Sequence, residues 1–201
     1  MQMYSRMLVS GAVLLALGAW SLAANNRGLA DDSAGVSGQV QKVADALGKG
    51  DADQAKKLAA EIAKSTETED FMGLMALRRA KTKKPVFGVG AKPGAVTPDG
   101  IEALIMALSK RPDKKLIDKN AEALAVLAHR VEAIALVASA KVPEKDEGQK
   151  KKKDWLEWSS DMGKSAKELA KAAEAKSLPE VKAAAAKLTS TCNNCHGVFR
   201  D

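Results

Sequence analysis

The sequence predicts an all-α protein, and three observations support this. The chain of 201 residues contains only three Trp, three Phe and one Tyr. Windows rich in Ala, Lys and Glu, with few aromatic or β-branched residues, favour helices over strands. A composition of 46% hydrophobic and 28% charged residues excludes wholesale disorder, and two cysteines are too few for a disulfide scaffold. A core so poor in large rings leaves volume for something other than side chains.

The amino terminus, residues 1–23, has the pattern of a secretory signal peptide. Arg6 precedes an apolar stretch over 7–19, and small residues then lead to a predicted cleavage site after Ala23. The alternative is a retained membrane anchor, because the apolar stretch is close to the length that spans a bilayer. We expect cleavage, a mature helical domain over 24–201, and an extracytoplasmic, periplasmic location.

The segment 37–80 predicts a set of N-terminal helices. Two short apolar stripes lie on either side of Asp51, a residue type that caps helix N-termini, so 37–64 is expected to form a helical hairpin. A third, weaker helix is expected over 68–80. The stripe residues are Val40, Val43, Ala44 and Leu47, then Ala55, Leu58, Ala59 and Ile62; the third helix carries Phe71, Met72 and Met75.

The segment 81–100 is a predicted loop, because it contains four glycines and three prolines. Its Gly88-Val89-Gly90 has the look of a phosphate cradle. A cradle of that kind needs a strand before it and a helix directly after it, and neither is predicted here. The segment is therefore expected to connect helices rather than to bind a nucleotide.

The segment 101–201 predicts four helices of a bundle. A short helix begins at Ile101, and a long one runs from Leu116 to just before Pro143 with apolar residues nearly all round, which indicates burial on two sides. After a lysine-rich turn over 143–153, apolar residues recur every three or four positions, as in an antiparallel bundle. They are Trp155, Trp158, Met162, Leu169 and Ala172, with the small polar Ser165 at the same spacing.

The last helix is expected to begin with a capping box, Ser177 to Glu180. Its apolar stripe continues into the sequence Cys192-Asn193-Asn194-Cys195-His196. On a helix, residues three and four apart share a face, so two thiols and one imidazole project together. Two such thiols can form thioethers with the two vinyl groups of haem, and the imidazole then lies under the iron. This pentapeptide predicts covalent attachment of one haem c, with His196 as proximal iron ligand.

Three other uses of these residues have to be weighed against haem attachment. A thioredoxin-type dithiol sits at a helix start after a strand, whereas this motif lies at a helix end. A zinc site would need four ligands, and Cys192, Cys195, His196 and His129 are the only ones of suitable type. A plain disulfide between Cys192 and Cys195 would leave a non-haem helical bundle.

The C-terminal sequence CNNCHGVFR, preceded by a helix with paired Trp155 and Trp158, resembles the class II c-type cytochromes, the cytochrome c-prime group. The resemblance covers about residues 150–201. It implies an antiparallel four-helix-bundle-like core, here with an additional N-terminal hairpin and the Gly/Pro-rich loop. By position, Cys192 and Cys195 would hold the haem, His196 would be its axial ligand, and Arg200 would match the family's basic residue after the motif. Trp155, Trp158 and Phe199 are expected beside the haem.

The sixth iron position decides between two functions. In some members of this family a methionine fills it and the protein carries electrons; in others it is open to gases such as nitric oxide or carbon monoxide. The chain is longer than usual for the family, so the family's first helix, which supplies that position, has no clear counterpart. Met72 is the first candidate and Met75 the next, followed by Met106 and Met162, although any of them could simply pack in the core.

The remaining polar residues give weaker indications. His129 lies opposite the main stripe of its helix, so a solvent or second-interface position is expected. Lysines at 81, 83 and 84 and at 150–153 could steer an acidic redox partner, or simply be solvated turns. The chain has no serine–histidine–acid set, paired catalytic carboxylates or nucleotide loop, so an enzyme and a nucleic-acid partner are not expected. A membrane contact is expected only if the N-terminal segment is retained, and a homodimer is compatible with the family.

Overall fold

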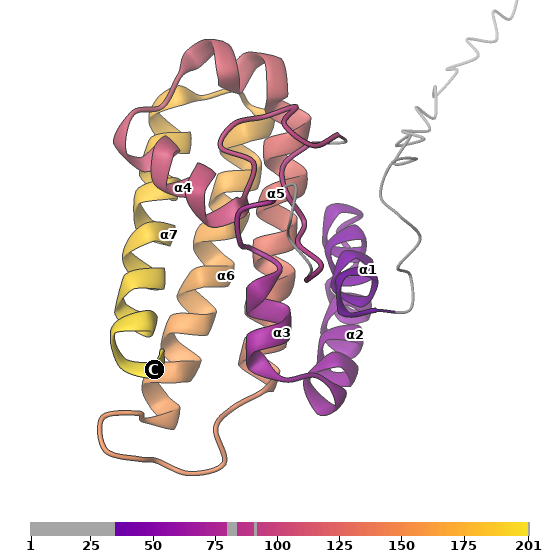
Figure 1. Ribbon diagram of the computed structural model, residues 1–201, viewed down its shortest axis with the longest axis vertical. Coiled ribbons are helices and arrows are strands. Elements are labelled where there is room, and N and C mark those ends of the chain that lie inside the picture. Colours follow the sequence, from indigo (N-terminus) through magenta and orange to yellow (C-terminus); the bar gives the residue numbers. More distant parts are fainter. Residues whose placement is uncertain (1–34, 80–83, 91, 201) are drawn as a thin grey trace, which may run out of the picture.

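The computed structural model describes residues 35–79, 84–90 and 92–200, and these residues form helices joined by turns and loops (Figure 1). Within that part of the chain no β-strand occurs, and the one β-bridge joins Glu147 to Lys150. The predicted all-α class is therefore confirmed. The helices are α1 (Val36–Gly48), α2 (Ala52–Ser65), α3 (Thr68–Gly73), α4 (Ile101–Lys110), α5 (Lys114–Ala140), α6 (Lys152–Glu174) and α7 (Leu178–Phe199).

Helix α5 is the centre of the molecule. It packs against α6 on one side and against the α1–α2 hairpin on the other, while α7 packs between α6 and α4. Helices α4 to α7 thus form a bundle, and the predicted burial of α5 on two sides is confirmed. By length and composition alone α5 could cross a membrane, but its apolar residues are mostly buried, as in a core helix of a helical bundle.

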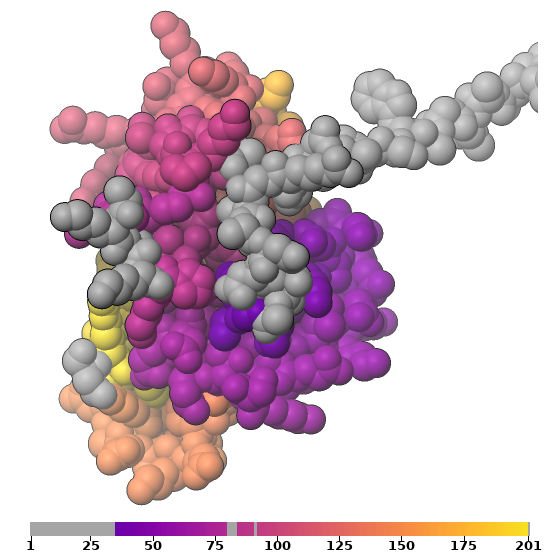
Figure 2. Space-filling model, turned by 45° about the vertical axis from the view of Figure 1, so that its right-hand side comes forward, coloured from indigo at the N-terminus to yellow at the C-terminus, as the bar shows by residue number. Residues whose placement is uncertain are grey.

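The N-terminal hairpin forms as predicted. Asp51 caps α2, because its carboxylate accepts a hydrogen bond from the backbone N–H of Gln54 at 3.0 Å. The buried face of the hairpin includes Val40 and Val43 from α1 and Ala55 and Ala59 from α2. Figure 2 shows the hairpin, in indigo and purple, on one side of the molecule and the turn between α5 and α6, in orange, at the lower end.

Helix α3 is shorter than predicted. The sequence pattern extends it over 68–80, but the helix ends at Gly73 after six residues. Apolar Leu74 and Met75 continue the pattern and are buried, yet their backbone carbonyls accept hydrogen bonds from the N–H groups of Phe87 and Glu102. Bonds to distant segments replace the helical ladder, so the chain leaves the helix and runs towards the loop.

The junction of α6 and α7 corrects the predicted capping box. Ser177 is the N-cap residue of α7, but its side chain makes no capping hydrogen bond. Its N–H donates instead to the carbonyl of Ala172, and the N–H of Lys176 donates to Ala173, with Lys176 at φ 52°. This is a Schellman motif that ends α6, and it takes the N–H that Glu180 would have to accept. The turn reverses the chain and brings the C-terminus beside the first turns of α6 (Figure 1).

Two predictions concern residues that are not described, or not fully. The signal peptide over 1–23 lies outside the described residues, as do Lys81 and Lys83. The predicted loop 81–100 is irregular in its described part, 84–90 and 92–100. The lysine-rich turn ends slightly earlier than predicted, because α6 begins at Lys152.

Candidate haem site

The two cysteines and the histidine lie on the last two turns of α7. The earlier turns of this helix are fixed by Val181, Ala184, Ala185 and Leu188, which are buried against α6 and α4. From Thr191 onwards the helix is covered less completely, and Cys192, Cys195 and His196 are half-buried. Three donor groups therefore share one face of α7. The N-terminal turns of this helix are packed in the bundle, and its last two turns, which carry the donors, are partly exposed.

A cavity of about 290 Å³ opens on these last two turns. Residues of α3, α4, α6 and α7 supply its walls. The helix α7 contributes Cys195, His196 and Phe199, followed by Arg200, and α6 contributes Trp155. The opposite wall consists of Thr68, Glu69, Met72 and Gly73 of α3, then Ala76, and Glu102 of α4.

A second, smaller cavity of about 20 Å³ adjoins the same motif. Three of its lining residues, Met72, Cys195 and His196, also line the larger cavity. Its other lining residues are Met75, Trp158, Ser159, Met162, Thr191 and Cys192. The predicted donors and the first-choice methionine, from helices more than 100 residues apart in sequence, therefore meet at one place.

Three aromatic rings close the lower end of the site. Phe199 lies edge-to-face against Trp155, with ring centroids 5.0 Å apart, and against Trp158, at 6.0 Å. The indole N–H of Trp155 donates to the backbone carbonyl of Ala138 at 2.7 Å, which ties α6 to the end of α5. These rings give the site an apolar boundary against water.

The thiols are held in an environment that favours their neutral form. Burial, the charge of Glu102 and the neighbouring Cys195 raise the pKa of Cys192 to about 11. Burial also raises the pKa of the Cys195 thiol. A thioredoxin-type dithiol requires the opposite, a thiol with a lowered pKa, so the electrostatics of the site argue against that alternative.

The zinc alternative fails on geometry. Within the described residues no group of three or more His, Cys, Asp or Glu side chains is arranged to hold a metal ion. His129, the fourth residue it would need, lines a different cavity between α1, α5 and α6, where its Nδ1 lies 3.6 Å from Glu132. This agrees with the predicted second-interface position. Both cysteines are free thiols, so the disulfide of the third alternative is absent from this structure.

The residues present fit a haem. Two thiols at a spacing of three and an adjacent imidazole form the donor set for covalent attachment, and they border a cavity with aromatic and thioether walls. A helical bundle whose last helix carries such a site defines a class of protein, the helical c-type cytochromes.

Comparison with known proteins agrees with that class. The family model described as Cytochrome C' matches residues 101–200, the segment that runs from α4 to the end of α7. Through this C-terminal half the chain is a member of the cytochrome c' family, the class II c-type cytochromes, whose cofactor is one covalently bound haem c. No curated protein and no solved structure matches the chain.

The structure distinguishes among the predicted site residues. Trp155, Phe199 and Arg200 line the larger cavity, and Trp158 lines the smaller one. Met75 and Met162 line only the smaller cavity, whereas Met106 is 45% exposed and lines neither. Sequence reasoning missed Glu102, which lines the larger cavity from the first turn of α4. Its position directly after the predicted loop was the only available signal.

Proposed function

We propose that this protein is an exported monohaem c-type cytochrome that transfers electrons. In this proposal Cys192 and Cys195 form the two thioether links, His196 is the proximal iron ligand and Met72 is the sixth ligand. When bound, the haem supplies a one-electron couple, and a methionine ligand raises its reduction potential into the range of electron carriers.

The single observation that carries the proposal is the position of Met72. It lines both cavities together with His196, although it comes from α3 and the histidine from α7. Met72 is half-buried, so its side chain is neither enclosed in the hydrophobic core nor fully exposed to solvent. Met75, by contrast, is 3% exposed and borders only the smaller cavity.

The other residues of the site serve to shield and to orient. Trp155 and Phe199 cover the cavity with apolar surface, which keeps water from the haem and lowers the local dielectric. The α7 backbone holds Cys192, Cys195 and His196 at fixed helical spacing, so the two links and the imidazole have one common orientation.

The proposal is tested by replacing the candidate ligand. We expect Met72→Leu to abolish the weak long-wavelength absorption band of sulfur-ligated ferric haem, to lower the reduction potential and to speed carbon monoxide binding to the ferrous protein. Leucine keeps the apolar volume, so the change isolates the sulfur atom. Optical spectra, potentiometry and stopped-flow mixing measure the three effects.

Met106→Leu is the matched control, because Met106 is an exposed methionine on α4 that lines neither cavity. It should leave all three measurements at the values of the unmodified protein. If the unmodified ferrous protein already binds carbon monoxide without displacing a ligand, the sixth site is open and the function is gas binding rather than electron transfer.

The proposed location is the periplasm or another extracytoplasmic space, which the apolar segment at 7–19 supports. The proposed partners are acidic redox proteins. Lys150 and Lys151 directly precede α6, and Lys152 and Lys153 are in its first turn, two to five residues before the cavity-lining Trp155. Charge of this sign raises the rate of encounter with an acidic surface, and the rate should fall as ionic strength rises.

A further inference from the structure

The segment that follows Met72 is fixed by hydrogen bonds to distant parts of the chain. We name residues 72–78 the Met72 arm. The arm turns sharply after α3, where the N–H groups of Met75 and Ala76 donate to the carbonyls of Met72 and Gly73. Three backbone bonds then attach it to the loop and to α4: Phe87 N–H to Leu74 O at 2.9 Å, Glu102 N–H to Met75 O at 3.2 Å, and Arg78 N–H to Asp99 O at 2.7 Å.

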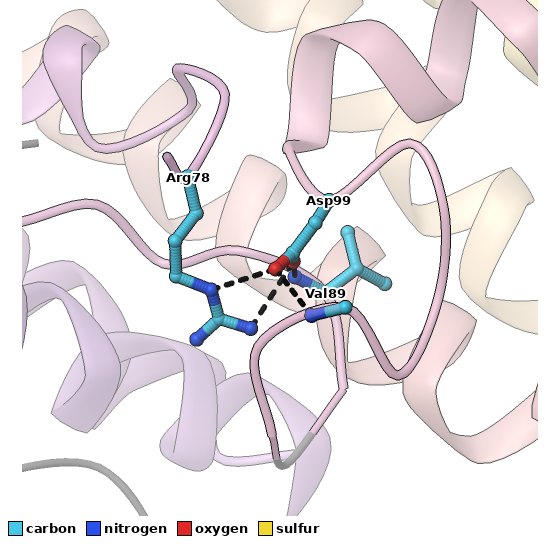
Figure 3. Close-up of polar contacts among 4 residues, drawn as sticks. Arg78, Val89 and Asp99 are labelled. Atoms are coloured by element: carbon cyan, nitrogen blue, oxygen red, sulfur yellow. Dashed lines mark hydrogen bonds and ion pairs between the residues drawn. The ribbon is translucent and has the colours of Figure 1, made fainter. Parts of the chain in front are cut away.

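The carboxylate of Asp99 secures the end of the arm. It accepts two hydrogen bonds from the guanidinium of Arg78, at 2.9 and 3.1 Å, and two from backbone N–H groups, of Val89 at 2.6 Å and of Gly94 at 2.9 Å. Figure 3 shows the Arg78 and Val89 contacts converging on this one side chain. Asp99 is only 8% exposed, so these bonds are made largely out of contact with water. The glycine-rich loop does cradle an anion, and that anion is the chain's own carboxylate.

We call the Asp99 carboxylate, with its bonds from Arg78, Val89 and Gly94, the Asp99 clamp. One position next to this clamp requires glycine. Gly88 has φ +59°, and a Cβ atom there would lie 2.3 Å from Nε and Cζ of Arg78. The guanidinium of Arg78 therefore occupies the space that a side chain at residue 88 would need.

We propose that Asp99 is a positioning residue for the sixth ligand of the haem: by clamping Arg78 it holds the Met72 arm against the α7 motif. The inference rests on the proposed role of Met72. Met72, Gly73 and Ala76 line the cavity, whereas Arg78 and Asp99 do not. Asp99 thus acts through the arm and has no contact with the haem pocket itself.

The other contacts around the arm explain why losing the clamp should release Met72 without unfolding the protein. Leu74 and Met75 of the arm are buried, as is Phe71 directly before it, and two of the three backbone bonds do not involve Asp99. Without the carboxylate the arm keeps its apolar anchors but loses the bond network at its end. We therefore expect a larger population of states with Met72 away from the site, not an unfolded protein.

The test uses two variants of the haem-loaded full chain. One alters the acidic partner of the clamp and the other alters its basic partner. Asp99→Asn removes the charge, and Gly88→Ala displaces Arg78 while leaving Asp99 in place. In both we expect the sulfur-ligand band of the ferric protein to weaken and carbon monoxide to bind the ferrous protein about tenfold faster, as a detached ligand becomes more populated. Met72→Leu removes the sulfur ligand altogether, so it should give the largest loss of the band and the fastest carbon monoxide binding.

Val181→Ala is the control for general loss of stability, because Val181 is fully buried at the far end of α7 from the motif. It should lower the melting temperature and leave the band and the carbon monoxide rate unchanged. The inference is overturned if Asp99→Asn and Gly88→Ala both keep the original band and rate while Met72→Leu changes them, or if Val181→Ala speeds binding equally. If Met72→Leu itself changes nothing, the proposed ligand is wrong, which is a separate result.

Discussion

The two walls of the cavity are built in different ways. The wall from α6 and α7 carries Cys195, His196 and Trp155 on long regular helices, and its donors are spaced by helical geometry alone. The wall from the Met72 arm belongs to a six-residue helix and a turn, held by a carboxylate 21 residues further along the chain. The first wall depends on local periodicity and the second on long-range polar contacts.

The difference also appears in how each wall is stabilised. The upper part of α7 is buried in the bundle, but its last two turns, which carry the motif, are only half-covered. The Met72 arm is the reverse: its side chains at Leu74 and Met75 are fully buried, while its course depends on hydrogen bonds. We therefore expect bound haem to stabilise the α7 wall, and the clamp at Asp99 to stabilise the arm.

The largest effect is expected from breaking the α7 wall. Cys192→Ala with Cys195→Ala should abolish covalent haem, because no thiol remains to form a thioether. The denatured protein should give no haemochrome spectrum, and its mass should equal that of the polypeptide alone. The control is Asn193→Ala with Asn194→Ala, two exposed residues of the same turn, which should keep the haem.

The same variant shows how far the α7 wall depends on its cofactor. Without haem the last turns of α7 lose their cover, so we expect much of the helix to remain while the fixed packing around Trp155 and Trp158 is lost. Near- and far-ultraviolet circular dichroism separate these two properties. Haem that stays attached through denaturation, or an apo form with the near-ultraviolet signal and melting temperature of the holo form, would contradict this picture.

A smaller effect is expected from acid, and it acts on the arm. Burial alone would raise the pKa of Asp99, but the hydrogen bonds from Arg78, Gly94 and Val89 and the charge of Arg78 outweigh it and lower the pKa below its ordinary value. A lowered pKa in the folded state means that Asp99 contributes stability above its unfolded pKa, and that this contribution is lost as the pH falls through the folded value.

The measurement is the free energy of unfolding in urea between about pH 5 and pH 2. Stability of the unmodified protein should fall with acid more steeply than that of Asp99→Asn, which has no carboxylate to protonate. Glu157→Gln, a change at an exposed position on α6, should retain the steeper fall. Equal slopes in all three proteins would show that the Asp99 cluster does not couple the arm to folding.

The contrast between the walls also explains what the sequence could predict. Apolar periodicity was sufficient for the α1–α2 hairpin and for α5, α6 and α7, and helical spacing was sufficient for the shared face of Cys192 and His196. It failed at α3, because Leu74 and Met75 fit a helical pattern although their carbonyls bond to Phe87 and Glu102. A pattern in one segment contains no information about partners more than ten residues away.

The clamp had one signal in the sequence, although its meaning depends on the fold. Asp99 is the only acidic residue in the segment 81–100, among several lysines and glycines. Such an isolated acid in a glycine-rich segment is suited to accept backbone N–H groups. Its pairing with Arg78 could not be predicted, because it follows from the close approach of Gly100 to the backbone of Leu77, where a Cβ atom would lie 2.6 Å from the Leu77 Cα.

The smallest effect is expected at Trp155, where the independence of the two walls can be tested most directly. Its indole N–H bonds to the Ala138 carbonyl, which also accepts from the N–H of Lys141. Trp155→Phe keeps a ring against Phe199 but removes this donor, and the free energy of unfolding should fall by about 1 kcal/mol. The covalent haem should remain, and so should the sulfur-ligand band, because Met72 is held from the other wall.

Trp158→Phe, at the half-buried ring of the same cluster, is the comparison for ring size. A band that weakens in Trp155→Phe but not in Trp158→Phe would show that the α6–α7 wall also positions Met72, and that the two walls work as one.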